Sequence, residues 1–213
     1  MAFNWDDWAF TRDGDPPAEW PWWMDRRHVE FIYSLLMTGK FRRVLEIGCH
    51  HGSSTAALVQ AINDGIDLDL HLCDPDDNDR LRRVIAACTG RVAYHPCDSL
   101  RVLPVRQWDM VIVDGDHRLP QASRELGLLL AQEVQTIIAH DVEVRWMGEW
   151  CAGSVLLGDV LRMHPAYRCE VDAEKRPGEF TERGLLWATR HEELHRLGVE
   201  AFRKHAAAKR FTC

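Results

Sequence analysis

The fold of this chain is indicated most clearly by the stretch Val44-Leu45-Glu46-Ile47-Gly48-Cys49-His50-His51-Gly52-Ser53-Ser54-Thr55. It begins as an apolar strand, breaks at a turn that holds Gly48 and Gly52, and resumes as an apolar-periodic helix from Thr55. Such a strand–turn–helix unit brings free backbone N–H groups and the positive end of a helix to one place, which suits a nucleotide-like ligand. Glu46 closes the strand where its carboxylate can meet that ligand.

The spacing of the glycines separates this turn from two familiar phosphate-binding loops. It reads Gly-x-x-x-Gly-x-Ser, whereas dinucleotide enzymes carry Gly-x-Gly-x-x-Gly and phosphate loops end in Lys-Ser/Thr. The alternative interpretation is that the glycines serve only to pack a helix against its strand.

The composition indicates one domain of ordinary size and excludes several classes of function. The chain has 213 residues, 46% of them hydrophobic, and no stretch approaches the ~18 uninterrupted apolar residues of a membrane span. A net charge of −7 argues against a nucleic-acid partner. The seven cysteines form no Cys-x-x-Cys pair, and the acidic N-terminus lacks a signal sequence. We therefore expect a cytoplasmic protein with reduced thiols and with neither a membrane nor a nucleic-acid partner.

Short apolar strands alternate with helices through the middle of the chain. We expect strands at 43–47, 67–73, 91–95, 108–113 and 135–139, with helices at 25–38, 53–62, 79–88 and 120–131. This alternation predicts an α/β fold, a doubly wound and mostly parallel Rossmann-like sheet with helices on both faces.

Beyond Asp141 the pattern loosens. We expect an insert at about 142–163 with a helix near 155–162, followed by two strands, 167–171 and 184–190, that form a C-terminal antiparallel pair. The predicted main domain is then 25–190, and a C-terminal helix occupies 191–213.

Residues 1–24 form a tryptophan-rich N-terminal arm. Five of the nine tryptophans in the chain lie here: Trp5, Trp8, Trp20, Trp22 and Trp23. Asp13-Gly14-Asp15 and Pro16-Pro17 interrupt the arm, so we do not expect one amphipathic helix. Two interpretations stay open: an arm anchored on the domain by its aromatic rings, or a lid that gives aromatic walls to a substrate pocket. The same arm could instead pack on a second subunit and form a homodimer.

Four predicted strands end in polar residues, namely Glu46, Asp74, Asp114-Gly115-Asp116-His117 and His140-Asp141. The carboxyl ends of parallel strands share one edge of a sheet, and ligands bind there. Any one of these carboxylates could be a helix cap, but together they predict a ligand site. Asp74 is placed to face the glycine turn and to accept both hydroxyls of a ribose. Without a phosphate-binding fingerprint, the expected ligand is a nucleoside that lacks a pyrophosphate.

The motifs in this order resemble the class I S-adenosylmethionine-dependent methyltransferases. They are Val-Leu-Glu-Ile-Gly-x-x-x-Gly-x-Ser, an acidic end to the second strand, Val-Asp-Gly-Asp-His, and Ala-His-Asp. Within that class they resemble the small metal-dependent O-methyltransferases of the catechol and macrocin type, and their relatives with Asp-Gly-Asp-His and a later His-Asp. The resemblance covers roughly residues 40–142, about half of the chain.

The resemblance implies S-adenosylmethionine as the cofactor and assigns residues to it. Glu46, Gly48 and Gly52 would form the cradle for its methionine part, and Ser54 would hydrogen-bond its carboxylate. Asp74 would contact the ribose, and Asp98 and Ser99 would lie beside the adenine, with Asp98 accepting from its exocyclic amine. Asp114 is also among the implied cofactor-binding residues.

The resemblance also implies a divalent-metal site. Asp114, His140 and Asp141 fall where the family places its metal ligands, and His117 falls where catechol-type enzymes keep a catalytic lysine. We therefore expect His117 and Asp114 to be catalytic, with Mg²⁺ or Mn²⁺ as a metal to test. His140 stands in place of a carboxylate, which shifts the preference towards Mn²⁺, Fe²⁺, Zn²⁺ or Ni²⁺, or means that no metal binds. The family's usual Pro-Gly-Gly turn is replaced by Ala131-Gln132-Glu133-Val134.

The leading hypothesis is O-methylation of a hydroxylated small molecule, phenolic or sugar-like, with His117 as general base and with metal assistance. One alternative is a metal-independent enzyme of the same fold that methylates nitrogen, oxygen or a carboxylate. Others are a nicotinamide oxidoreductase, which the missing Gly-x-Gly-x-x-Gly opposes, and a non-catalytic protein that binds S-adenosylmethionine or another protein.

Overall fold

The structure, a computed structural model, describes residues 2–12, 24–173 and 184–208. Its centre is a seven-stranded sheet with the order β3-β2-β1-β4-β5-β7-β6. The strands are β1 (Arg43–Ile47), β2 (Asp69–Cys73), β3 (Val92–His95), β4 (Met110–Val113), β5 (Thr136–His140), β6 (Arg168–Asp172) and β7 (Leu185–Thr189). The first five are parallel, and β7 pairs antiparallel with both β5 and β6. The predicted mostly parallel sheet with an antiparallel C-terminal pair is confirmed.

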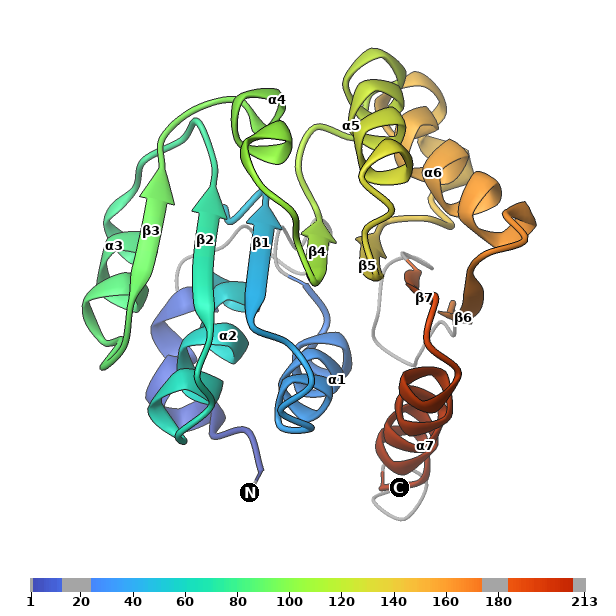
Figure 1. Cartoon of the computed structure of the whole chain (residues 1–213). Helices are drawn as coiled ribbons and strands as arrows, with labels where there is room; N and C mark the ends of the chain where they lie inside the picture. Colours follow the sequence, from blue (N-terminus) through green and yellow to red (C-terminus); the bar gives the residue numbers. More distant parts are fainter. Residues whose placement is uncertain (1, 13–23, 174–183, 209–213) are drawn as a thin grey trace.

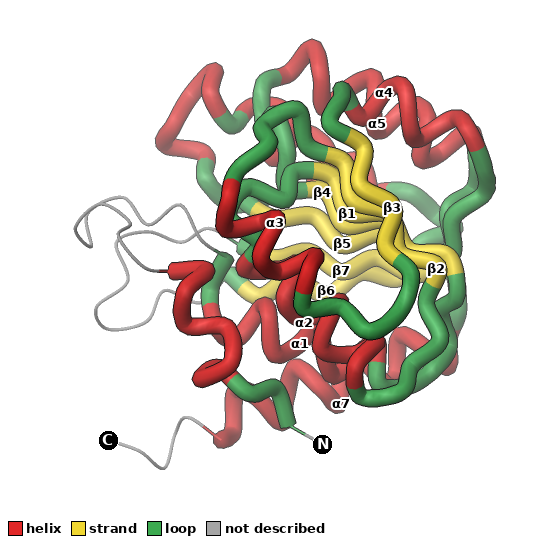
Figure 2. Tube along the Cα trace, turned by 90° about the vertical axis from the view of Figure 1, so that its left-hand side faces the viewer, coloured by secondary structure: helices red, strands yellow, loops and turns green. Residues whose placement is uncertain are grey.

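Helices cover both faces of the sheet, as Figures 1 and 2 show. One face carries α1 (Arg26–Leu36), α2 (Ser53–Asn63), α3 (Asp79–Ala86) and α7 (Glu192–Ala208). The other carries α4 (Ser99–Val102), the short 3₁₀ helix η2 (Leu103–Val105), α5 (Leu119–Ala131) and α6 (Ala152–Met163). α1 lies between α2 and α7 and contacts both, while α5 packs against α6. This arrangement is a doubly wound, class I methyltransferase-like fold.

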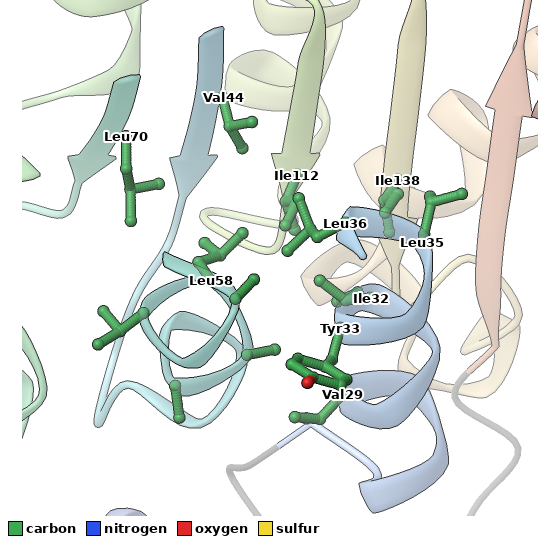
Figure 3. Packing of buried hydrophobic residues seen from close by; sticks show 14 of the residues in the cluster. Val29, Ile32, Tyr33, Leu35, Leu36, Val44, Leu58, Leu70, Ile112 and Ile138 are labelled. Atoms are coloured by element: carbon green, nitrogen blue, oxygen red, sulfur yellow. The ribbon is translucent and has the colours of Figure 1, made fainter. Parts of the chain in front are cut away.

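Alternate residues of the strands belong to two separate hydrophobic cores, one on each face of the sheet. Val44 contributes to the cluster beneath α1 and α2, whereas its neighbour Leu45 contributes to the cluster beneath α5 and α6. The period of two follows from the pleat of a strand, and it explains why the parallel strands read as continuous apolar runs. Figure 3 shows the first cluster, where the side chains of α1 and α2 interdigitate with those of β1, β2, β4 and β5.

Strand register brings the predicted polar residues to one level. Ile47 of β1 pairs with Cys73 of β2 and with Val113 of β4, and Val113 pairs in turn with Ala139 of β5. The residues that follow these four partners are Gly48, Asp74, Asp114 and His140. They therefore lie in one row at the carboxyl edge of the sheet, as expected for parallel strands.

The described part of the N-terminal arm packs on its own chain. It forms a 3₁₀ helix, η1 (Trp5–Arg12), which contacts α2 and α3. Trp8 is buried and donates its indole N–H to Gln60 Oε1 of α2 at 3.0 Å, and Trp5 donates to Glu30 Oε1 of α1 at 2.8 Å. Trp20, Trp22 and Trp23 lie outside the described residues, so the lid interpretation stays a prediction.

The segment after β5 contains more helix than its sequence pattern indicates. A 3₁₀ helix, η3 (Arg145–Trp150), precedes α6, which begins three residues earlier than the 155–162 helix that we expected. Within the described residues, no helix combines the length and the apolar character that crossing a membrane requires.

Candidate active site

The glycine turn after β1 lies directly against the loop after β4. Gly48 has a φ of +80°, and a Cβ on it would stand 2.2 Å from the backbone oxygen of Asp114. Its N–H donates to Cys73 O at 2.9 Å, while the N–H of Asp114 donates to Ile47 O at 2.8 Å. Only glycine accommodates both the positive φ and this approach of two backbones. The contact between the loops after β1 and β4 thus explains why the predicted cradle has a glycine at position 48.

The buried carboxylate of Glu46 is held by the first turn of α2. Glu46 has no exposed surface, and its two oxygens accept from the hydroxyls of Ser54 and Thr55, the latter at 2.7 Å. Burial raises the pKa of Glu46 to about 7, an effect that the two hydroxyl donors oppose. Gly52 (φ +84°) is the N-cap of α2, and a Cβ there would lie 2.9 Å from Val84 Cγ2. The structure thus places Ser54 on Glu46; its role towards a cofactor carboxylate stays a prediction.

Asp74 faces the glycine turn from the end of β2, as predicted. It is 7% exposed, and its Oδ2 accepts from the backbone N–H groups of Cys49 and His50 at 2.7 and 2.8 Å. Its Oδ1 accepts from the N–H of Asp76 at 2.8 Å. Each carboxylate oxygen has two lone pairs, so Oδ1 retains the capacity to accept from a further donor such as a ribose hydroxyl.

Asp98 and Ser99 lie in the turn between β3 and α4, and α5 supports both. Asp98 caps α4 by accepting from the N–H of Leu100 at 2.8 Å. The hydroxyl of Ser99 donates to Glu125, which is buried on α5, and the amide of Gln121 donates to Asp98 and Ser99. Gln121 and Glu125 were not anticipated from the sequence, where they read as ordinary residues of an amphipathic helix.

Four ionisable side chains converge at the ends of β4 and β5. The Nδ1 atom of His140 lies 3.1 Å from Asp114 Oδ1 and 3.4 Å from Asp141 Oδ1. The Nε2 atom of His117 lies 3.6 Å from Asp114 Oδ1 and 3.3 Å from Asp141 Oδ2. Each histidine therefore faces both carboxylates. The structure brings together all four residues that the sequence analysis assigned to metal binding and to base catalysis.

The donor set at this cluster fits a divalent cation. One ligand atom each from Asp114, His140 and Asp141 can be chosen so that all lie within 4.8 Å of one another. Asp141 adopts a left-handed backbone conformation, with φ +58°. Aspartate tolerates this conformation better than most residues, and such backbone outliers concentrate at functional sites. An imidazole with two carboxylates suits Mn²⁺, Fe²⁺, Zn²⁺ or Ni²⁺ better than Mg²⁺ or Ca²⁺.

A buried histidine of α1 packs against His140. His28 of α1 is fully buried, and its ring meets that of His140 edge-on at 5.5 Å between centroids. Burial lowers the pKa of His28, against the opposing effect of Asp172. The buried Arg27 lies 3.0 Å from Asp172 and 3.7 Å from Asp25. These residues were missed because α1 and β6 meet only in the folded chain.

Comparison with known proteins agrees with this geometry. Residues 45–142 match the family described as a methyltransferase domain. Comparison with curated protein sequences found no significant match.

Three solved structures illustrate the likeness of fold. One is the O-methyltransferase TomG from Streptomyces achromogenes, which is involved in tomaymycin synthesis and was solved with S-adenosylmethionine. It is 15% identical to this chain with a TM-score of 0.65, and the match covers 89% of this chain and 91% of that chain. An O-methyltransferase from Bacillus cereus in complex with S-adenosylhomocysteine is 17% identical with a TM-score of 0.64, over 85% and 87%. The S-adenosylhomocysteine-bound methyltransferase PaMTH1 from Podospora anserina is 16% identical with a TM-score of 0.64, over 88% and 87%.

Proposed function

We propose that this chain, whose residues 45–142 match a methyltransferase domain, is an S-adenosylmethionine-dependent methyltransferase that methylates a hydroxyl oxygen of a small molecule, phenolic or sugar-like. The observation that carries the proposal is the cluster of Asp114, His117, His140 and Asp141, in which each histidine lies within 3.6 Å of both carboxylates. This cluster adjoins the glycine turn, because a Cβ on Gly48 would lie 2.2 Å from Asp114 O. A group that removes a proton therefore lies beside the expected cofactor cradle.

The residues at the cradle fit S-adenosylmethionine. The glycine turn and the first turn of α2 would hold its methionine part, Asp74 its ribose, and Asp98 with Ser99 its adenine. The cofactor supplies a methyl group on a sulfonium centre, and its transfer is an in-line displacement that needs little covalent help from the protein. The main task of this chain is then to align an acceptor oxygen and to remove its proton.

His117 is the proposed general base. Its Nε2 is oriented by Asp114 and Asp141, and an imidazole exchanges protons near neutral pH. Asp114, His140 and Asp141 would hold a divalent cation, whose positive charge favours ionisation of a bound hydroxyl. His140 is 2% exposed, and its position against the ring of His28 restricts its rotation.

A metal-independent enzyme of the same fold is the second candidate. It is favoured by the contacts of His140 with Asp114 and Asp141, because a protonated imidazole at His140 can neutralise these carboxylates without a cation. In that case His117 alone removes the proton from oxygen, nitrogen or a carboxylic acid.

Calorimetric titration tests the proposal. S-adenosylhomocysteine should bind the wild-type chain, and Asp74→Ala should weaken that binding at least about tenfold, since hydrogen bonds to a charged acceptor are lost. Titration with Mn²⁺ alone should give an isotherm that Asp141→Ala abolishes. Asp67→Ala serves as the control, because Asp67 is an exposed aspartate near the opposite edge of the sheet. No binding of S-adenosylhomocysteine would contradict the proposed function, and binding without a metal isotherm would select the metal-independent candidate.

The acceptor class needs a separate assay. Transfer of labelled methyl from S-adenosylmethionine should be measured with a panel of phenols and with the matching anilines. We expect methylated phenols, and methylation of the anilines alone would overturn the assignment to oxygen.

A further inference from the structure

A hydrogen-bonded network connects α5 to the turn between β3 and α4. Glu125, 1% exposed, accepts from the hydroxyl of Ser99 through Oε1. The side-chain amide of Gln121 donates to Ser99 Oγ at 2.9 Å and to Asp98 Oδ1 at 3.1 Å, and its nitrogen also lies 3.1 Å from Glu125 Oε1. Two residues of α5 thus contact two consecutive residues of the turn.

The network has a fixed direction that begins at the buried carboxylate. A carboxylate only accepts hydrogen bonds, so the hydroxyl hydrogen of Ser99 is directed at Glu125. The oxygen of Ser99 is then left to accept, and its partner is the NH₂ group of Gln121. Glu125 therefore determines which way the Gln121 amide faces, and with it which atom of that amide meets Asp98.

The network holds one oxygen of Asp98 and leaves the other for a ligand. Both donors, the N–H of Leu100 at 2.8 Å and the amide of Gln121, engage Oδ1. Within residues 2–12, 24–173 and 184–208, Oδ2 of Asp98 accepts no hydrogen bond. Asp98 is an exposed residue at the carboxyl edge of the sheet, so Oδ2 can accept from a donor on a bound molecule.

We propose that Gln121 and Glu125 are positioning residues that aim Asp98 at the exocyclic amine of adenine, so that α5 sets the base preference of the cofactor site. This inference rests on the proposed function, in which Asp98 accepts from that amine. It adds two residues of α5 that the motifs of the turn do not contain. Their effect on the cofactor passes through Asp98 and Ser99.

The energetics of Glu125 agree with a positioning role. Burial raises the pKa of its carboxyl, the hydrogen bonds from Ser99 and Gln121 lower it, and the negative charge of Asp98 raises it. Its Oε2 is buried and has no hydrogen-bond partner among the described residues. A buried carboxyl oxygen without a hydrogen-bond partner costs stability, so packing alone does not favour Glu125 at this position.

The test compares two ligands that differ at the exocyclic group of the base. Dissociation constants for S-adenosylhomocysteine and S-inosylhomocysteine are measured by calorimetry. The inosyl compound has a carbonyl oxygen in place of the amine, so its exocyclic group cannot donate to Asp98. We expect the wild-type chain to prefer the adenosyl ligand about 10- to 100-fold, the range for a hydrogen bond to a charged acceptor.

The variants then assign the preference. Gln121→Leu and Glu125→Leu should reduce it to about threefold or less, and Glu125→Gln, which keeps an acceptor for Ser99, should restore most of it. The matched control is Gln132→Leu at the C-cap of the same helix, because Gln132 is also half-buried and donates to Leu103 O at 2.7 Å without touching Asp98. This control should keep the wild-type preference.

The outcomes separate failure of this inference from failure of the proposed function. If the wild-type chain binds neither ligand, the proposed function is wrong. If Asp98→Ala removes the preference while Gln121→Leu leaves it unchanged, the cofactor site stands and the positioning role is refuted. If Glu125→Leu fails to fold, Gln121→Leu and Glu125→Gln still decide the question, since both positions keep a side chain of similar size.

Discussion

The carboxyl edge of the sheet has two halves that differ in how their polar groups are satisfied. At the ends of β1 and β2, Glu46 accepts from two hydroxyls and Asp74 from three backbone N–H groups. At the ends of β4 and β5, Asp114 and Asp141 lie against the imidazoles of His117 and His140. In the first half the carboxylates accept from hydroxyls and backbone N–H groups, whereas in the second the carboxylates lie between two imidazoles.

This difference indicates which half holds a ligand and which performs chemistry. Side chains held by hydrogen bonds from hydroxyls and backbone amides keep a fixed orientation and can position a ligand. Ionisable groups within 3.1–3.6 Å of one another can exchange a proton or share a cation. We therefore expect substitutions in the β1–β2 half to act on stability and cofactor affinity, and substitutions in the β4–β5 half to act on turnover.

The largest effect on stability is expected from Gly48→Ala. The new Cβ would stand 2.2 Å from Asp114 O, where neither backbone can move away, and the positive φ adds its own cost. We predict a loss of more than about 4 kcal/mol in the free energy of unfolding, measured by urea denaturation. Gly65→Ala is the matched control, because its φ is +98° but no atom lies within 4 Å of the new Cβ. That control should lose about 1–2 kcal/mol, and an equal loss in both variants would refute the steric account.

The next effect is expected on turnover, from His117→Ala. Removing a general base should lower kcat about 10²–10⁴-fold, with the dissociation constant of S-adenosylhomocysteine unchanged. The pH profile of kcat/KM should lose its acidic limb, because the group that must be deprotonated is gone. His191→Ala, an exposed histidine next to α7, is the control. If the variant also loses Mn²⁺ binding, His117 is a metal ligand, and its assignment as the general base is contradicted.

A smaller effect is expected from Glu46→Gln, and it depends on pH. The pKa of Glu46 is raised by burial to about 7, so the folded chain holds a proton on this carboxyl that the unfolded chain has lost above about pH 4.5. The wild-type chain should thus lose stability relative to the variant as pH rises from about 4.5 to 7, by about 3 kcal/mol in total. Urea denaturation at several pH values measures this difference. Replacing the exposed Glu149 leaves the buried carboxyl in place, so Glu149→Gln should show no such trend, and a constant difference for Glu46→Gln would contradict the prediction.

Much of the fold followed from local patterns in the sequence. The apolar runs with helices between them predicted the parallel sheet, because only buried strands read as continuous apolar segments. The polar residues after β1, β2, β4 and β5 were predicted to share one edge, since parallel strands present their carboxyl ends together, and the register confirms this. The start of α6 was placed three residues late, because Ala152-Gly153-Ser154 carries no strong apolar period.

The apolar pattern of the sequence was enough to predict which residues lie at or next to the carboxyl ends of the strands: Glu46, Asp74, Asp114, His117, His140 and Asp141. Only the tertiary structure decided what each of them touches. The contacts of His28 with His140 and of Glu125 with Ser99 join elements more than 20 residues apart, and no local pattern encodes them. The physical reason is that side-chain direction depends on how whole layers pack. Helices α1 and α5 reach the site only after the sheet has brought their strands together.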